Sequence, residues 1–226
     1  AQPMAEPTPA ADHKFYPAMA YKPAGHDPEI QARIDAFFDF CVAQEAAVFV
    51  HCTPQGFQTR LKLGANAHPK HWRDVLEDSR WSTLRLCLGH AGGGRMQNGD
   101  LKSPGWMAGS DDEWKDADNF ARIVTELCVT YPNVYCEIGY ITALFENDKL
   151  EVFVANIERA RKAAKAANRP YNLLDKMAYG SDWHMPDMVD NTRKYLDIFL
   201  GIMNRKAYRS HLDRFFWQNA YRFVKL

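Results

Sequence analysis

Residues 84–94 read LRLCLGHAGGG, and this stretch decides the fold class. Leu84–Gly89 is a mostly apolar run of strand length, and His90 follows it directly. Continuous apolar runs, without polar alternation, are typical of parallel strands covered by helices on both faces of the sheet. The glycines that follow His90 lack the GxGxxG spacing of a dinucleotide-binding turn. The stretch therefore predicts a buried parallel strand that ends in an ionisable residue.

Similar apolar runs recur on both sides of this stretch, with helix-like segments between them. The other predicted strands are Lys14–Tyr16, Ala46–Cys52, Val134–Ile138 and Lys176–Tyr179. Helices are expected after Asp27-Pro28, from Pro69, from Ser110 through Cys128, around 153–164, and through much of 195–216. Regular alternation of strand and helix predicts an α/β fold with right-handed crossovers.

The alternation fits both a (β/α)8 TIM-barrel-type fold and an open doubly wound sheet, and the barrel is favoured because the Gly-rich phosphate turn of an open sheet is absent. His51 and His90 are 39 residues apart, His90 and Glu137 are 47 apart, and Glu137 and Asp182 are 45 apart. A complete barrel takes about 250 residues and eight strands. This chain has 226 residues and five recognisable strands. We therefore expect a partial barrel whose N-terminal strands are missing.

Composition excludes several classes of protein. With 46% hydrophobic and 25% charged residues, the chain is globular and has no membrane-spanning run. Its formal net charge of zero gives no reason to expect nucleic acid or a membrane as partner. The odd number of cysteines, five, predicts free buried thiols and a cytoplasmic protein. Residues 1–12 are Pro- and Ala-rich and are interpreted as a tail or linker before a domain at 13–226. The alternative that a leader peptide was removed before Ala1 is left open.

Ionisable residues stand at the carboxyl ends of four predicted strands: His51, His90, Glu137 and Asp182. In a barrel these ends lie on one face, where active sites are built. Two imidazoles and a carboxylate that converge there suit one divalent transition metal such as zinc. Each residue alone is more often structural, but three on successive strands favour a metal site.

The order of these motifs resembles the metal-dependent amidohydrolase superfamily, in the branch that contains aminocarboxymuconate-semialdehyde decarboxylase. The matching stretches are KFYPAMAYKP (14–23), VFVHCTPQG (48–56), HPKHW (68–72), LRLCLGHAGGG (84–94), NVYCEIG (133–139), MAYGSDW (177–183) and FFWQNAYRF (215–223). The resemblance covers nearly the whole chain after the tail and corresponds to about the C-terminal two thirds of the barrel.

The resemblance implies a role for each of three residues. His51 would be a metal ligand, and Asp182 would ligate the metal or take a proton from its water. His90 would lie beside the metal and orient or deprotonate that water. The implied activity is hydrolysis of a C–N or C–O bond, of amide or lactone type, in a small-molecule substrate. The alternatives are non-oxidative decarboxylation of an aromatic or unsaturated acid, and an inactive half-barrel that serves as a binding or structural module.

Substrate contacts are predicted on weaker grounds. Arg95 is placed to bind a carboxylate, while Trp106 and Trp183 could line a pocket for a planar substrate. The segment 91–113 is interpreted as a lid, with an ordinary solvated insertion as the alternative. The resemblance assigns no firm role to Glu137, which could support the residues of the metal site or, equally, be a buried ion-pair partner. The histidines outside the strand ends, apart from His184 beside Asp182, are interpreted as surface or packing residues.

One departure from the family puts activity in doubt. The His-x-His pair of the family's first strand, which supplies two further metal ligands, occurs nowhere in these 226 residues. The chain could be a fragment, a half-barrel completed by another chain or a second copy, or a module that has lost its activity. Because an open five-stranded sheet exposes unpaired edges, we expect a homo-oligomer or a missing companion segment.

Overall fold

The computed structural model describes residues 28–54, 63–98, 101–182 and 192–225. Its main sheet has the strand order β1-β2-β5-β6, and every neighbouring pair is parallel. The strands are β1 (Ala47–His51), β2 (Arg85–Gly89), β5 (Val134–Glu137) and β6 (Met177–Ala178). Each lies inside a predicted strand. The tail 1–12 and the predicted strand Lys14–Tyr16 lie outside the described residues.

The α/β class with a parallel sheet is therefore confirmed, but a barrel is not. Within the described residues the sheet is open, since β1 and β6 each have one neighbouring strand. The consecutive order of the four strands, with a crossover between each pair, is the order found in a segment of a barrel wall. Closure of the sheet stays a prediction.

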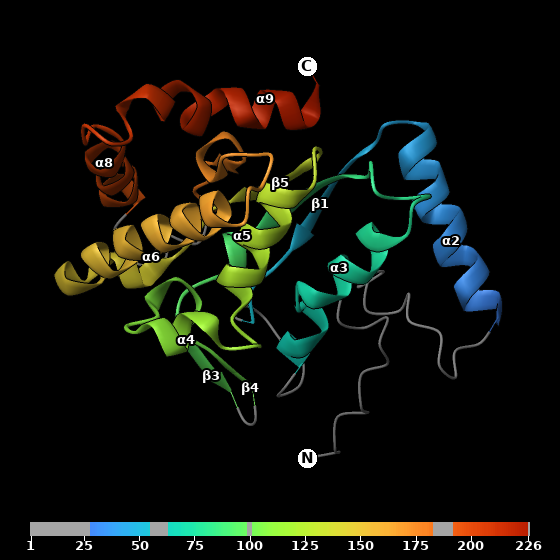
Figure 1. Ribbon diagram of the computed structural model, residues 1–226, viewed down its shortest axis with the longest axis horizontal. Helices are drawn as coiled ribbons and strands as arrows, with labels where there is room; N and C mark the ends of the chain where they lie inside the picture. Colours follow the sequence, from blue (N-terminus) through green and yellow to red (C-terminus); the bar gives the residue numbers. More distant parts are fainter. Residues whose placement is uncertain (1–27, 55–62, 99–100, 183–191, 226) are drawn as a thin grey trace, which may run out of the picture.

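Helices occupy the segments between the strands (Figure 1). α2 (Pro28–Ala43), α3 (Lys70–Glu77) and α8 (Thr192–Met203) begin near the predicted positions, whereas α6 (Asn147–Ala166) begins six residues before the expected range 153–164. Short helical turns complete the crossovers and the C-terminal region: η2 (Leu63–Ala67), η5 (Thr142–Phe145), η6 (Leu173–Asp175), η7 (Arg209–His211), the π-helical turn η8 (Arg214–Gln218) and α9 (Asn219–Val224).

The prediction of one helix from Ser110 through Cys128 is wrong. The structure has two, α4 (Asp111–Lys115) and α5 (Phe120–Thr130). Asp116 leaves the helical region and its side chain accepts a hydrogen bond from the Asp118 backbone N–H at 2.8 Å. Asn119 then starts a new helix, because its side chain accepts the Ala121 N–H at 3.1 Å. Short polar side chains that bond the local backbone compete with helix in this way.

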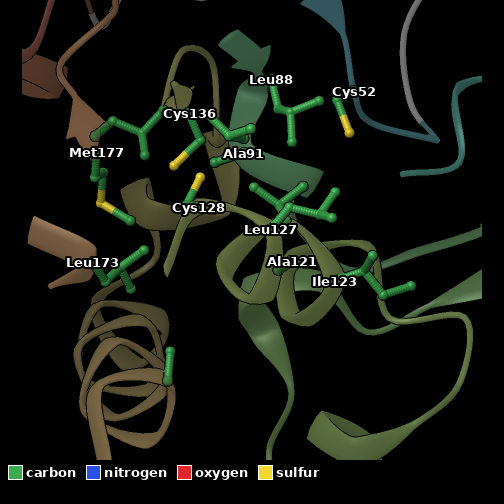
Figure 2. Close-up of a cluster of buried hydrophobic side chains, with 14 of the residues drawn as sticks. Cys52, Leu88, Ala91, Ala121, Ile123, Leu127, Cys128, Cys136, Leu173 and Met177 are labelled. Carbon is green, nitrogen blue, oxygen red and sulfur yellow. The ribbon is translucent and has the colours of Figure 1, made fainter. Parts of the chain in front are cut away.

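The core lies between the sheet and the helices, and α5 supplies much of it. Leu127 and Cys128 of α5 pack beside Leu88 and Cys136 of the strands, and all four are at most 2% exposed. Figure 2 shows the Cys128 and Cys136 thiols pointing toward one another. All five cysteines are free and buried, as predicted. Burial raises the pKa of the Cys52 and Cys87 thiols, so they are protonated and inert.

The C-terminal segment packs against β6 and the amino ends of β2 and β5. Asn219 donates to the carbonyls of Leu174 and Met177 at 3.0 and 2.8 Å, and Arg85 donates to the Phe223 carbonyl. Figure 1 shows α9 above the strands, with the β3–β4 hairpin (Met96–Asn98 and Leu101–Ser103) below them. The amino end of the sheet is thus filled by structural contacts, which leaves the carboxyl end for a site. None of the described helices combines the length and the apolar character needed to cross a bilayer.

Candidate functional site

Two histidines meet at the carboxyl end of neighbouring strands. His51 is the last residue of β1 and pairs in register with Gly89, so His90 begins the next turn, η3 (His90–Gly92), beside it. The two imidazole centroids are 4.9 Å apart and the ring planes are inclined by 72°. The predicted convergence of His51 and His90 is therefore present in the structure.

Hydrogen bonding fixes the orientation and the tautomer of His90. Its Nδ1 lies 2.9 Å from the backbone carbonyl oxygen of Gly139. Because a carbonyl can only accept, Nδ1 carries the proton, and the lone pair of the neutral ring resides on Nε2. An imidazole held through Nδ1–H in this way is the usual arrangement for a metal ligand or a general base.

Glu137 connects the loops that carry these groups. Its Oε2 accepts the backbone N–H of His90 at 3.2 Å, and the carboxylate also receives the backbone N–H of Gly139. Burial raises the pKa of the Glu137 carboxyl, and the nearby charge of Asp182 raises it further, while the two N–H donors oppose the shift. Of the two interpretations that the sequence left open, a residue supporting the site or a buried ion-pair partner, these contacts favour the first, since the carboxylate accepts backbone N–H groups at the end of β2 and after β5.

Two glycines make room for that carboxylate. A Cβ on Gly180 would lie 1.5 Å from Glu137 Oε1, and a Cβ on Gly139 would lie 2.4 Å from the same atom. The Cβ added on Gly139 would also lie 3.3 Å from the Cβ of Asp182. The ends of β2, β5 and β6 therefore meet around one carboxylate, which brings Asp182 to the same edge of the sheet as the histidines.

Unusual backbone conformations gather at this edge. Seven described non-glycine residues have positive φ, and four of them follow strands of the main sheet: His90 (60°), Ala91 (45°), Tyr140 (55°) and Asp182 (49°). Such conformations cost about 1–3 kcal/mol each and are concentrated at functional sites. The Tyr195 hydroxyl, which bonds the backbone of Ile138 and Ile141, supports the loop that carries Tyr140.

The side chains at this edge are of the types that bind a divalent metal, but too few of them are placed together to hold one. Imidazole nitrogens and a carboxylate are the ligands that zinc takes in enzymes. Over the described ranges, however, no group of three or more His, Cys, Asp or Glu side chains is placed to hold an ion. The described residues thus do not complete a coordination sphere, in keeping with the missing His-x-His pair.

The predicted substrate residues lie in different surroundings. Arg95 is exposed, and its guanidinium donates to both carboxylate oxygens of Glu113 and to the Met107 carbonyl at 2.9–3.1 Å. Trp106, in the turn η4 (Gly105–Met107), is fully buried, and its indole N–H donates to the Ala91 carbonyl at 2.8 Å. This burial favours a packing role for Trp106, while the role of Arg95 stays a prediction. Trp183 lies outside the described residues.

The segment 91–113 contains the turn η3, the β3–β4 hairpin and the turn η4. Its part around η4 is tied into the core, because Asn156 of α6 donates to the carbonyls of Trp106 and Ala108 at 2.8 and 2.9 Å. Movement as a lid would therefore have to be confined to the rest of the segment. Residues 99 and 100 lie outside the described part.

Two of the histidines assigned to surface or packing roles behave as expected. His68 is 2% exposed, its Nε2 lies 3.1 Å from Asp118 Oδ1, and burial lowers its pKa to about 4. His211 lies 3.0 Å from Asp175, beside the C-terminal segment. His13, His26 and His184 lie outside the described residues.

Comparisons of the chain with protein-family models, with curated proteins and with solved structures found no match. The resemblance to the amidohydrolase superfamily therefore rests on the sequence motifs alone.

Proposed function

We propose that this chain forms one wall of the active site of a metal-dependent hydrolase of the amidohydrolase-related type. The observation that carries the proposal is the pair of imidazoles of His51 and His90, 4.9 Å apart at the carboxyl edge of a parallel sheet, with Asp182 following β6 at the same edge. Active sites of parallel α/β proteins are built at the carboxyl ends of the strands. The sheet itself would be a segment of a TIM-type barrel, as the strand order and the motif order favour.

In this proposal the residues of the chain divide the work. Nε2 of His90, with its lone pair, would accept a proton from the attacking water, and Asp182 would be a second acceptor or a metal ligand. His51 would be a metal ligand. A divalent metal, zinc by preference, would supply polarisation of the scissile carbonyl. The substrate would be a small molecule with an amide-type or lactone-type bond, and the remaining ligands would come from outside the described residues.

Metal uptake is the first test, because it needs no substrate. We expect the purified chain, or its complex with a companion, to bind close to one zinc ion, and both His51→Ala and Asp182→Ala to abolish the uptake. His211→Ala is the matched control, since His211 lies at the C-terminal segment and should leave uptake unchanged. Metal content after dialysis and the metal-dependent rise in melting temperature are the measurements.

The outcomes separate the alternatives. Stoichiometric metal retained by both site variants would show that the proposed ligands are wrong. If the wild-type protein binds none of zinc, manganese and iron, the result favours the alternative that the chain is an inactive binding or structural module. With metal bound, hydrolysis of amides or lactones supports the proposal, whereas release of CO2 from aromatic acids indicates a decarboxylase on the same scaffold.

A second expectation concerns association. Among the described strands β1 lies at an edge of the sheet, and its Phe49 is 58% exposed although the ring lies against Gly89 of the neighbouring strand. Long unpaired apolar edges favour pairing with another chain or segment. We expect light scattering to give a mass above that of a monomer, and Phe49→Lys to lower it. Leu196→Lys, on an exposed position of α8, is the control. A sharp monomer peak with a cooperative melt contradicts this expectation.

A further inference from the structure

A groove of about 470 Å³ runs between α5 and α6 and is closed at one end by α4. Its floor is mostly apolar: Trp114, Val129, Ala160 and Ala164 are 4–9% exposed, and the hydroxyl of the buried Thr125 is bonded to the Arg122 carbonyl. The helices pack against each other, but alanines on α6 leave the space above them unfilled. The groove has the size of sites that hold small organic molecules.

The walls of this groove carry an excess of positive charge. The cations are Lys115, Arg122, Arg159, Lys162 and Arg169, and the acids are Asp111 and Glu126. Asp111 is paired with Arg159 at 2.8 Å, and Glu126 is shared between Arg122 and Arg73. Subtracting the two acids from the five cations leaves three positive charges on a chain whose net charge is zero.

Two of the arginines are already fixed in position. Arg159 donates to Asn156 Oδ1 at 2.6 Å as well as to Asp111, and Arg122 donates to the Asp116 carbonyl at 3.3 Å. In the described part of the chain, Lys115, Lys162 and Arg169 have no ion pair within 4.0 Å. Guanidinium groups held in place lose less entropy when they bind an anion, and the remaining cations are available to it.

We propose that this groove binds an organic anion, with a carboxylate or a similar head group on an apolar body of several carbons. The head group would lie among the cations of the rim, and the body would cover the apolar floor beside Trp114. An inorganic anion alone would leave the floor exposed, and a neutral body would leave the excess charge unpaired. None of the residues that line the groove belongs to the proposed active site, so the proposal is independent of the proposed function.

The probe is 8-anilinonaphthalene-1-sulfonate, which combines an anionic group with an apolar body, and its fluorescence reports binding. We expect one site per chain, displacement by decanoate, and little displacement by decanol or inorganic phosphate at equal concentration. Equal displacement by decanol would overturn the role of the charge, and displacement by phosphate alone would overturn the role of the floor.

Variants locate the binding. Ala163 is exposed and lines the groove, so Ala163→Leu should fill it without disturbing the core and should weaken binding about tenfold, which corresponds to 1.4 kcal/mol. Lys162→Glu should weaken the binding of decanoate and leave the binding of decanol unchanged. Lys165→Glu is the matched control, because Lys165 lies on the same helix outside this groove. Unchanged decanoate affinity in a folded Ala163→Leu protein would overturn the proposal.

Discussion

Gly92→Ala is expected to destabilise the native state by several kcal/mol or to prevent folding altogether. A Cβ on Gly92 would lie 2.4 Å from the backbone N of Ala121 and 2.6 Å from both Ala121 Cα and the Phe120 carbonyl carbon. These are atoms of the first turn of α5, which is fully buried, and no side-chain rotation relieves the contact. Gly92 also has φ of +87°, which an L side chain rarely adopts.

The two costs add at a point where two strands and a helix meet. The Gly92 N–H donates to the Cys52 carbonyl at 2.8 Å, so any shift of the glycine also loosens the end of β1. Overpacking and backbone strain each cost about 1–3 kcal/mol, and their sum is a large fraction of the stability of a typical domain. We therefore expect a loss of about 2–6 kcal/mol in the free energy of unfolding, or failure to fold.

Urea denaturation followed by circular dichroism measures this loss, and the same glycine triplet contains the control. At Gly94 the nearest atoms to a Cβ are 3.8–3.9 Å away and φ is not positive. The free energy of unfolding of Gly94→Ala should consequently lie within about 1 kcal/mol of the wild-type value. If Gly92→Ala were as stable as Gly94→Ala, the inference that α5 packs directly against Gly92 in the turn η3 would be wrong.

The difference between these two glycines shows where sequence reasoning stops. The strands could be predicted because each is a continuous apolar run, and the site because an ionisable residue ends each run. Nothing in the letters GGG distinguishes Gly92 from Gly94, since the distinction lies in the packing of a helix thirty residues further along. The partners of Glu137 could not be predicted for the same reason: the N–H of His90 and the space at Gly180 become its neighbours only when the crossovers from β2 to β5 and from β5 to β6 are complete.

The break between α4 and α5 has a local cause that was visible in the sequence. Asp116, Asp118 and Asn119 are all residues that bond the nearby backbone, yet the apolar periodicity from Trp114 to Cys128 favoured one helix. The break matters for the site, because it lets α5 start where its first turn meets Gly92. Closure of the barrel is a different case: the described sheet is open at β1 and β6, so closure stays a prediction.

Gly180→Ala tests the arrangement around Glu137 and is expected to cost about 2–4 kcal/mol, from overpacking together with loss of a buried hydrogen bond. The added methyl group would occupy the place of Glu137 Oε1, so the carboxylate has to turn away. The backbone N–H groups of His90 and Gly139 then lose their acceptor, and the orientation of the His90 turn is no longer fixed. Metal uptake should fall together with stability.

A double-mutant cycle assigns this cost to Glu137. In a Glu137→Ala background the carboxylate is absent, and Gly180→Ala should cost only about 1 kcal/mol, giving a coupling of about 1–3 kcal/mol between the two positions. Gly201→Ala on α8 is the control: no atom lies within 4 Å of its added Cβ, and an exposed helical site should gain about 0.5–1 kcal/mol. An equal cost of Gly180→Ala in both backgrounds would show that the glycine is required by something other than the carboxylate. The predicted coupling makes Glu137 the residue that holds the ends of β2, β5 and β6 together, and therefore the one that sets the geometry of the histidine and aspartate beside it.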